Sequence, residues 1–346
     1  MTNKLPRWRG FNLLEMFIWE PGGELVSAGG AGDFREADFE WIREWGFDFV
    51  RIPMDYRFWT VADPAGGSGG AWRFRVETLE RIDRLVELGR QYGVHVSLDF
   101  HRAPGYCVNP PAEARSLWTD PAMQGMFCAQ WHALALRYKG IPSERLSFDL
   151  VNEPPSPGAC GLTRKNHEQV VRGAVAAIRG VDPERLIVAD GLTYGQEVVK
   201  EIIDLGDQQV GQSCRAYGPF GISHYQAPWV NYPWTQAPRW PGADHFGSTW
   251  GRAELEAYYA PWAALVQRGV GVHCGEGGCF NKTPHAVFLA WFTEVLEILQ
   301  GHGIGWALWN FRGPFGVVDS ERGDVAYEDF HEHKLDRELL ELLRRS

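Results

Sequence analysis

Two kinds of apolar pattern alternate along the chain. Short runs rich in Val, Ile, Leu and Phe are typical of buried strands, and longer segments with an apolar residue every three or four positions are typical of covering helices. The predicted strands, with the first one's loop, cover residues 9–17, 47–53, 94–101, 146–151, 185–191, 220–225, 269–276 and 304–311. The predicted helices cover residues 34–45, 76–92, 118–138, 167–179, 194–205, 255–268, 284–299 and 335–345.

Eight strands alternating with eight helices predict an α/β fold, a single (β/α)8 TIM barrel. Neither a linker nor a break in composition interrupts the 346 residues, so we expect one domain over residues 1–346. The structural alternative is a doubly wound open sheet, which would need a G-x-G-x-x-G loop after the first strand. Residues 9–15, Arg-Gly-Phe-Asn-Leu-Leu-Glu, do not supply that loop.

Two glutamates stand where predicted strands end. Asn152 and Glu153 follow the apolar run 146–151, and Pro154 then ends the strand because proline has no N–H to donate. Glu276 lies in a glycine-rich turn that follows a second β-prone run. In a barrel, active sites lie at the carboxyl ends of the strands. A pair of carboxylates there is what a retaining glycosidase needs, one as acid/base and one as nucleophile.

Further polar or aromatic residues stand at other predicted strand ends, namely Arg51, His101, His224 and Trp309. Each alone is weak evidence, since a single histidine beside a strand is more often structural. A buried polar group costs free energy unless it is paired. Together these residues therefore indicate one functional site.

These motifs resemble glycoside hydrolase family 5, the cellulase-like family of the retaining clan of barrel glycosidases. The resemblance rests on Val-Arg51-Ile-Pro, Leu-Asp-Phe-His101, Asn152-Glu153-Pro154, Glu276 and Trp309, together with the dipeptide His224-Tyr225. It implies Glu153 as acid/base and Glu276 as nucleophile, with β-1,4-linked glucan-type poly- or oligosaccharides as substrate. The supporting residues that it implies are Arg51, His101, Asn152, His224, Tyr225 and Trp309.

One departure from the family concerns the sixth strand. The family usually has His-x-Tyr there, with the tyrosine hydrogen-bonded to the nucleophile, whereas Gln226 occupies the third position after His224. Tyr225 or the Gln226 amide could take that role, and the sequence leaves both possibilities open.

The expected roles have a physical basis. A cation such as Arg51 favours the ionised form of a neighbouring carboxylate, which Glu276 needs for attack. Glu153 must start protonated, so it needs an apolar wall or a nearby carboxylate that raises its pKa. Asn152 would bind the sugar 2-hydroxyl, and in a retaining enzyme the two carboxyl groups lie about 5–5.5 Å apart.

Aromatic residues are frequent, with 16 tryptophans in the chain. Trp309 is expected to form the floor under the sugar, with Trp306 as the alternative, because sugar faces stack on indole rings. Trp59, Trp118, Trp229 and Trp234 are candidate sugar platforms in loops, of which we expect one or two to serve. Asp99 and Glu15 also stand near strand ends and are expected to be structural or to hydrogen-bond to residues of the site. Loops 55–73 and 227–251 are expected to shape the cleft.

Composition limits the possible partners. The net charge of −10 argues against nucleic acid or an anionic membrane as a partner. The start of the chain has no apolar signal segment and the six cysteines are scattered, which indicates reduced thiols and a cytoplasmic protein, or a secreted one whose signal is missing. No cofactor is expected, and the oligomeric state stays open.

Other functions compete with this interpretation. A metal-dependent hydrolase would have to use His95, His101, His273 and Cys274, but His95 and His101 lie at opposite ends of one predicted strand. The one His-x-His pair, His331 and His333, lies beyond the last strand. A non-catalytic carbohydrate-binding barrel would usually lose one carboxylate. Within the family, a β-mannanase, β-mannosidase or exo-acting enzyme remains the alternative.

Overall fold

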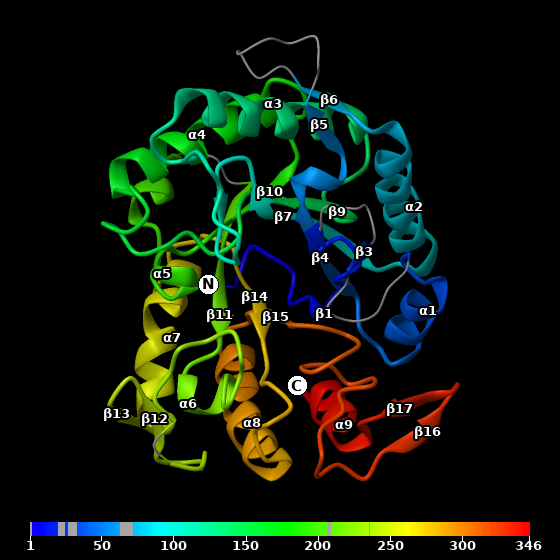
Figure 1. Ribbon diagram of the computed structural model, residues 1–346, viewed down its shortest axis with the longest axis vertical. Coiled ribbons are helices and arrows are strands. Elements are labelled where there is room, and N and C mark those ends of the chain that lie inside the picture. Colours follow the sequence, from blue (N-terminus) through cyan, green and yellow to red (C-terminus); the bar gives the residue numbers. More distant parts are fainter. Residues whose placement is uncertain (1, 20–24, 27–32, 63–71, 206–208, 235) are drawn as a thin grey trace.

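The computed structural model describes residues 2–19, 25–26, 33–62, 72–205, 209–234 and 236–346. Eight parallel strands form a closed barrel in which each strand pairs with its neighbours in chain order, including β4 with β7 (Figure 1). The strands are β1 (Arg9–Asn12), β4 (Phe49–Asp55), β7 (His95–Ala103), β9 (Leu146–Asp149), β10 (Leu186–Asp190), β11 (Val210–Ala216), β14 (Val272–Gly277) and β15 (Gly305–Leu308). The predicted TIM barrel is confirmed. A short strand β8 (Tyr106–Cys107) pairs antiparallel with the end of β7.

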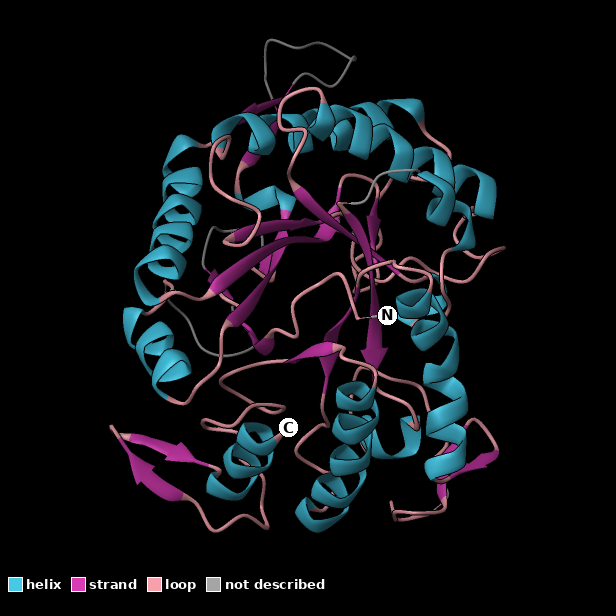
Figure 2. Ribbon diagram, turned by 180° about the vertical axis from the view of Figure 1, so that it is seen from behind, coloured by secondary structure: helices cyan, strands magenta, loops and turns pink. Residues whose placement is uncertain are grey.

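Helices surround the barrel (Figure 2), and their buried apolar side chains form one core cluster with those of the strands. The principal helices are α1 (Glu36–Glu44), α2 (Val76–Tyr92), α3 (Pro121–Arg137), α4 (Arg164–Arg179), α7 (Arg252–Gln267), α8 (His285–Gly301) and α9 (Arg337–Arg345). Helix α2 has the predicted bounds and ends at Gly93, whose φ of 68° lies in the left-handed region that glycine favours. Thr163 and Asn166 form a capping box at the start of α4.

The predicted helix over residues 194–205 is wrong in part. The structure has a four-residue helix α5 (Leu192–Gly195) and a separate 3-10 helix (Lys200–Leu205) in its place. Thr193 and Tyr194 have positive φ values of 56° and 60°, so a continuous helix cannot run through them.

The predicted sixth strand, residues 220–225, is also wrong. The strand at this place in the barrel is β11, and Phe220–Ser223 forms a short helix α6 after Pro219. Strand β11 has the sequence Val-Gly-Gln-Ser-Cys-Arg-Ala, which lacks a run of large apolar residues. Its polar side chains bond inside the protein, as Gln212 does to both backbone groups of Val199. Hydrophobicity therefore could not reveal this strand.

Among the described residues, four short antiparallel pairs of strands lie outside the barrel. They are β2 (Ile18–Trp19) with β3 (Leu25–Val26), β5 (Thr60–Ala62) with β6 (Trp72–Phe74), β12 (Ala243–His245) with β13 (Ser248–Trp250), and β16 (Glu328–Phe330) with β17 (His333–Leu335). The middle of the predicted loop 55–73, residues 63–71, lies outside the described residues.

The amino end of the barrel is closed by a separate apolar cluster of Leu5, Trp8, Phe49, Leu186 and Ala307. All six cysteines are free thiols. Within the described part of the chain, none of the helices has the length and apolar character that crossing a membrane requires.

Candidate active site

Glu276 lies near the carboxyl end of β14, and three side chains hold its carboxylate. Arg51 donates from Nη1 to Oε1 at 2.7 Å, and the Tyr217 hydroxyl donates to Oε2 at 3.0 Å. Arg215 brings Nη2 to 3.3 Å from Oε1. The three contacts fix the direction of the carboxylate, which suits a nucleophile.

Glu153 lies four residues beyond the end of β9 in an unusual backbone conformation. Its φ is 48°, in the left-handed region that a non-glycine residue rarely adopts. Its N–H donates to Asp190 Oδ2 at 2.8 Å, and its carbonyl oxygen accepts from the Tyr106 hydroxyl. Surrounding side chains thus hold a backbone that costs about 1–3 kcal/mol to maintain.

The Glu153 side chain bonds to Arg215, whose Nε lies 3.0 Å from Oε1. Burial, and then repulsion from Glu276, raise the pKa of Glu153 to about 8, although Arg215 acts in the opposite direction. At neutral pH Glu153 therefore holds a proton. A protonated carboxyl group is what a general acid requires.

Arg51 is the centre of a buried ionic network at the same end of the barrel. Its Nε donates to Asp149 at 2.7 Å, and its Nη2 donates to Asn152 Oδ1 at 2.9 Å and lies 3.1 Å from Asp99. Burial raises the pKa of Asp149 to about 7 and that of Asp99 well above its usual range. Asp99 thus belongs to the ionic network around Arg51.

Asn152 precedes Glu153 and is fully buried. Its Oδ1 accepts from Arg51 and from Arg215, so the amide is turned with Nδ2 away from both cations. Among the described residues, Nδ2 has no hydrogen-bond partner. A buried donor left without a partner costs free energy, and a sugar hydroxyl is the acceptor that the predicted role of Asn152 supplies.

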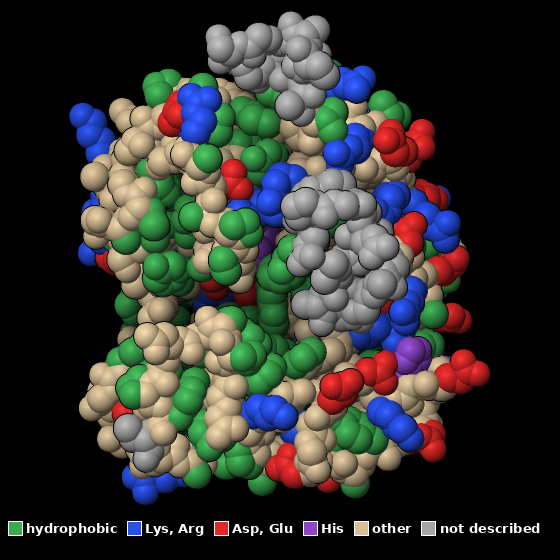
Figure 3. All heavy atoms as spheres, viewed as in Figure 1, with side chains coloured by type: hydrophobic (Ala, Val, Ile, Leu, Met, Phe, Trp, Pro, Cys, Tyr) green, Lys and Arg blue, Asp and Glu red, His purple; other side chains and the backbone are tan. Residues whose placement is uncertain are grey.

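Figure 3 shows the face above these residues hollowed across its middle, with acidic and basic side chains visible on the floor of the groove.

The comparisons with known proteins agree on one family. The family described as cellulase (glycosyl hydrolase family 5) matches residues 25–313. The chain belongs to glycoside hydrolase family 5. It is a glycosidase, which hydrolyses O-glycosyl bonds.

Individual relatives fit this family. Endoglucanase C of Acetivibrio thermocellus is 27% identical over 85% of this chain and 88% of its own length. Cellodextrinase A of Ruminococcus flavefaciens is 25% identical over 78% of this chain and 76% of its own length. A solved structure titled as a glycoside hydrolase is 41% identical with a TM-score of 0.88, covering 98% of this chain and 99% of that one. The endoglucanase Cel5A of Thermotoga maritima shares the fold at 22% identity and a TM-score of 0.76, over 97% and 96% of the two chains.

The family 5 pattern can be compared with the residues at the end of the sixth strand. The residue that bonds to Glu276 is Tyr217, directly after β11, whereas Tyr225 lies beyond α6 and has its side-chain bond with Gln226. Prediction of Tyr225 or Gln226 in this role was wrong because the strand was placed too late in the chain. The family pattern His-x-Tyr is met at the third position by Tyr217, and Arg215 stands where the histidine is usual. The sequence signal that could have identified Arg215 and Tyr217 is the tyrosine at the end of the polar segment 210–217, two positions after the arginine.

The two predicted histidines lie near the site in different settings. His101 is buried with Nε2 2.7 Å from Asn109 Oδ1, and its Nδ1 is 3.8 Å from Asp99. His224 follows α6 rather than a strand, and its ring contacts Tyr217 at a centroid distance of 5.0 Å. His224 therefore packs behind the tyrosine that bonds to Glu276.

Trp309 is half-buried just beyond β15, with its ring centroid 5.6 Å from that of His101. Its indole is thus placed at the same end of the barrel as the glutamates. Trp306, the alternative, is buried in the core against Phe47.

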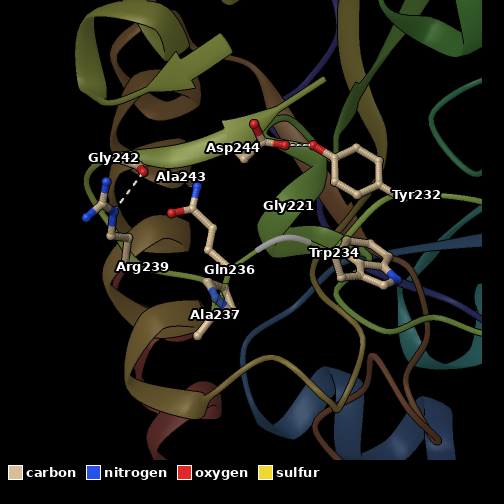
Figure 4. Close-up of a pocket in the computed structure, with 10 residues that line it drawn as sticks. Gly221, Tyr232, Trp234, Gln236, Ala237, Arg239, Gly242, Ala243 and Asp244 are labelled. Carbon is tan, nitrogen blue, oxygen red and sulfur yellow. Dashed lines mark hydrogen bonds between the residues drawn. The ribbon is translucent and has the colours of Figure 1, made fainter. Parts of the chain in front are cut away.

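The predictions of Trp59 and Trp118 as sugar platforms are wrong, because both are fully buried. Trp229 is 54% exposed and Trp234 is half-buried. Trp234 lines a pocket beside α6 together with Tyr232, Arg239 and Asp244, and Figure 4 shows the Tyr232 hydroxyl bonded to Asp244. Described residues of the loop 227–251 line this pocket together with Gly221, and the part of the loop in shaping the substrate cleft stays a prediction. Glu15 lines another pocket with Asp38 and Arg312, and burial raises its pKa to about 7.

The histidines considered as metal ligands have other contacts. His95 stacks on Trp8 and brings Nε2 to 2.8 Å from Ser147, and His273 Nε2 lies 3.3 Å from the Trp8 carbonyl oxygen. His333 pairs with Asp319. In the described ranges, no group of three His, Cys, Asp or Glu side chains is arranged to hold a metal ion.

Proposed function

We propose that this family 5 glycosidase hydrolyses β-1,4-linked glucan chains or oligosaccharides with retention of configuration, using Glu276 as nucleophile and Glu153 as acid/base. The observation that carries the proposal is the contrast between the two glutamates. Glu276 is held by Arg51, Arg215 and Tyr217, and the pKa of Glu153 is raised to about 8. The relatives named as an endoglucanase and a cellodextrinase support glucan as the substrate.

The first half of the reaction forms a glycosyl-enzyme. A Glu276 carboxylate oxygen bonds to the anomeric carbon while the bond to the leaving oxygen breaks, and Glu153 gives its proton to that oxygen. Arg51 and Tyr217 aim the attacking carboxylate, and Asn152 Nδ2 donates to the 2-hydroxyl of the sugar.

The second half releases the sugar. Once Glu276 is an ester it carries no charge, so the repulsion that raised the Glu153 pKa is gone and Glu153 can act as base. It takes a proton from water, whose oxygen bonds to the anomeric carbon as the ester bond to Glu276 breaks. The resting states of both glutamates are thereby restored.

The test is a panel of β-glucan, mannan and xyloglucan polymers and short cello-oligosaccharides, assayed for new reducing ends. We expect activity on glucan or cello-oligosaccharides, and in Glu276→Gln a loss of about 10⁴-fold or more, because the covalent route is closed. NMR of the first product anomer should show the β form. Inverted product, or a Glu276→Gln variant as active as the wild type, would contradict the mechanism. A preference for mannan would select the β-mannanase alternative, and binding without turnover the carbohydrate-binding one.

A further inference from the structure

Arg215 is a buried cation whose guanidinium group donates hydrogen bonds to several acceptors besides the Glu153 carboxylate. Its side chain is 1% exposed. Nη1 donates to Asp190 Oδ1 at 3.0 Å, to Ser213 Oγ at 2.9 Å and to the Cys214 carbonyl at 3.2 Å. Nη2 donates to Asn152 Oδ1 at 2.8 Å and to Asp190 Oδ2. The fixed fork of a guanidinium allows this set of bonds, which a lysine or histidine side chain could not make.

These bonds hold Glu153 at two points. Arg215 Nε bonds to the Glu153 carboxylate at 3.0 Å, and the Asp190 carboxylate that Arg215 fixes accepts the Glu153 N–H at 2.8 Å. Arg215, Asp190 and Glu153 thus form a closed ring of contacts around the left-handed backbone of Glu153. The same guanidinium lies 3.3 Å from Glu276.

We propose that Arg215 is a positioning residue of the glycosidase reaction, which joins the acid/base Glu153 and the nucleophile Glu276 in one frame and, through Asp190, fixes the backbone that aims Glu153. Being buried, Arg215 does not touch the sugar, and it acts through the two glutamates. This inference rests on the proposed function, since it assigns Arg215 to the proton transfer by Glu153.

The consequence concerns proton donation to the leaving group. A glycoside with a weakly basic leaving group departs without a proton, and one with a strongly basic leaving group needs a well-placed acid. If Arg215 aims Glu153, its loss slows the second kind of substrate far more than the first. A residue that only stabilises the fold would slow both alike.

The experiment compares 2,4-dinitrophenyl β-cellobioside with phenyl β-cellobioside on the wild type and four variants. Arg215→Gln removes the charge and Arg215→Lys keeps it, while Glu153→Gln reports the loss of the acid itself. Arg185→Gln is the matched control, because Arg185 is equally buried but bonds to carbonyl oxygens of Tyr138, Ile141 and Leu146 at the other end of the barrel. Thermal unfolding of each variant shows whether it is folded at the assay temperature.

In Arg215→Gln we expect kcat/KM, which reports departure of the leaving group, to fall about 10²-fold on the phenyl glycoside and less than about tenfold on the dinitrophenyl glycoside, given the usual size of general acid catalysis. Glu153→Gln should show the same bias more strongly, and Arg215→Lys a smaller one. Arg185→Gln should slow both substrates equally, whatever it does to the unfolding temperature.

The pH profile gives a second readout. The ionisable groups that face Glu153 are Glu276, Arg215, Asp190, Tyr106, Tyr194, Tyr217 and Tyr258. Of these Arg215 is the cation, and it lowers the pKa of Glu153. Its removal should therefore move the alkaline limb of kcat/KM to higher pH, and Arg215→Lys should leave the limb closer to that of the wild type.

Failure of this inference and failure of the proposed function would give different results. An active wild type whose Arg215→Gln variant loses both substrates equally, with an unmoved alkaline limb, would overturn the inference and leave the proposed function intact. A folded wild type that cleaves neither cellobioside nor any polymer of the panel would overturn the proposed function and the inference with it.

Discussion

Strand β7 carries a buried histidine near each of its ends, and the two differ in what their ring nitrogens contact. At the closed amino end, His95 brings Nδ1 to 3.1 Å from the Glu144 carbonyl and Nε2 to 2.8 Å from Ser147 Oγ. At the open end, His101 has Nε2 near Asn109, and Nδ1 has no hydrogen-bond partner among the described residues. Burial lowers the pKa of both, that of His95 to about 3.

The difference therefore lies in unused hydrogen-bonding capacity rather than in burial. Near the glutamates Asn152 Nδ2 also lacks a hydrogen-bond partner in the described part of the chain, whereas Asp99 is paired with Arg51. Buried polar groups of folded proteins are usually satisfied, so these two exceptions need an explanation. A substrate hydroxyl is the partner that the proposed function supplies for His101 and Asn152, whereas His95 has its partners in Glu144 and Ser147.

The largest effects should come from exchanging the two histidines for glutamine. We expect His101→Gln to lower kcat/KM about 10- to 100-fold, the equivalent of about 1–3 kcal/mol for a lost hydrogen bond in a buried site. His95→Gln should leave kcat/KM within about twofold while costing about 1–3 kcal/mol of unfolding free energy, because it breaks a packed, bonded core group. Steady-state kinetics and thermal unfolding measure the two effects. Equal losses of activity in both variants would remove the functional distinction between the two ends.

A pH-dependent effect should come from Glu153→Gln. Glu153 ionises near its ordinary value of 4.5 in the unfolded chain and near 8 in the folded protein. Between these values the folded state holds a proton that the unfolded state releases, so stability falls as pH rises through that window. The variant, which has no proton to release, should be more stable than the wild type at pH 8 by on the order of 1–3 kcal/mol.

Thermal unfolding at several pH values between 4.5 and 8 measures this difference, which should shrink toward the acid end. Glu168→Gln on α4, where Glu168 forms a half-exposed pair with Arg172, is a matched control that should show no such trend. A Glu153→Gln variant less stable than the wild type throughout would mean that the charged form is favoured by the site.

The smallest effect should come from the pocket beside α6. Replacing Trp234 by alanine removes an aromatic face worth about 0.5–1.5 kcal/mol, so we expect KM for long cello-oligosaccharides to rise about two- to tenfold at an unchanged kcat. Hydrolysis of an aryl cellobioside, the shortest substrate of the series, serves as the control. Equal KM values of variant and wild type for every chain length would exclude Trp234 as a sugar contact.

Much of this architecture could be predicted from the sequence. Apolar runs marked seven of the eight strands, and Pro154 and the glycines around Glu276 marked where two of them end. The sixth strand was not predicted because it carries polar residues, and the same polar residues make it important for the site. Strand β11 supplies polar groups to the interior, among them Arg215 and Ser213, so its pattern does not resemble that of a buried strand.

Aromatic residues show the other limit of prediction. Trp118 and Trp229 both stand in segments between strands, yet the first is fully buried and the second is more than half exposed. The exposure of a side chain in a loop depends on which other elements pack against it, and the local sequence does not contain that information. Residues that bond across the barrel, such as Tyr217 with Glu276, likewise become visible only when the strands are assembled.

Arg51 has a consequence for how the chain reaches its folded state. Its guanidinium on β4 contacts Asn12 of β1, Asp99 of β7, Asp149 of β9 and Glu276 of β14. Glu276 lies 225 positions from Arg51 in the chain, so the cluster cannot form before β14 has joined the strands at the start of the barrel. Until then each charge stays hydrated, and the assembly of these strands dehydrates the charges together. The charged groups of the active site are therefore brought together only when distant parts of the chain have assembled.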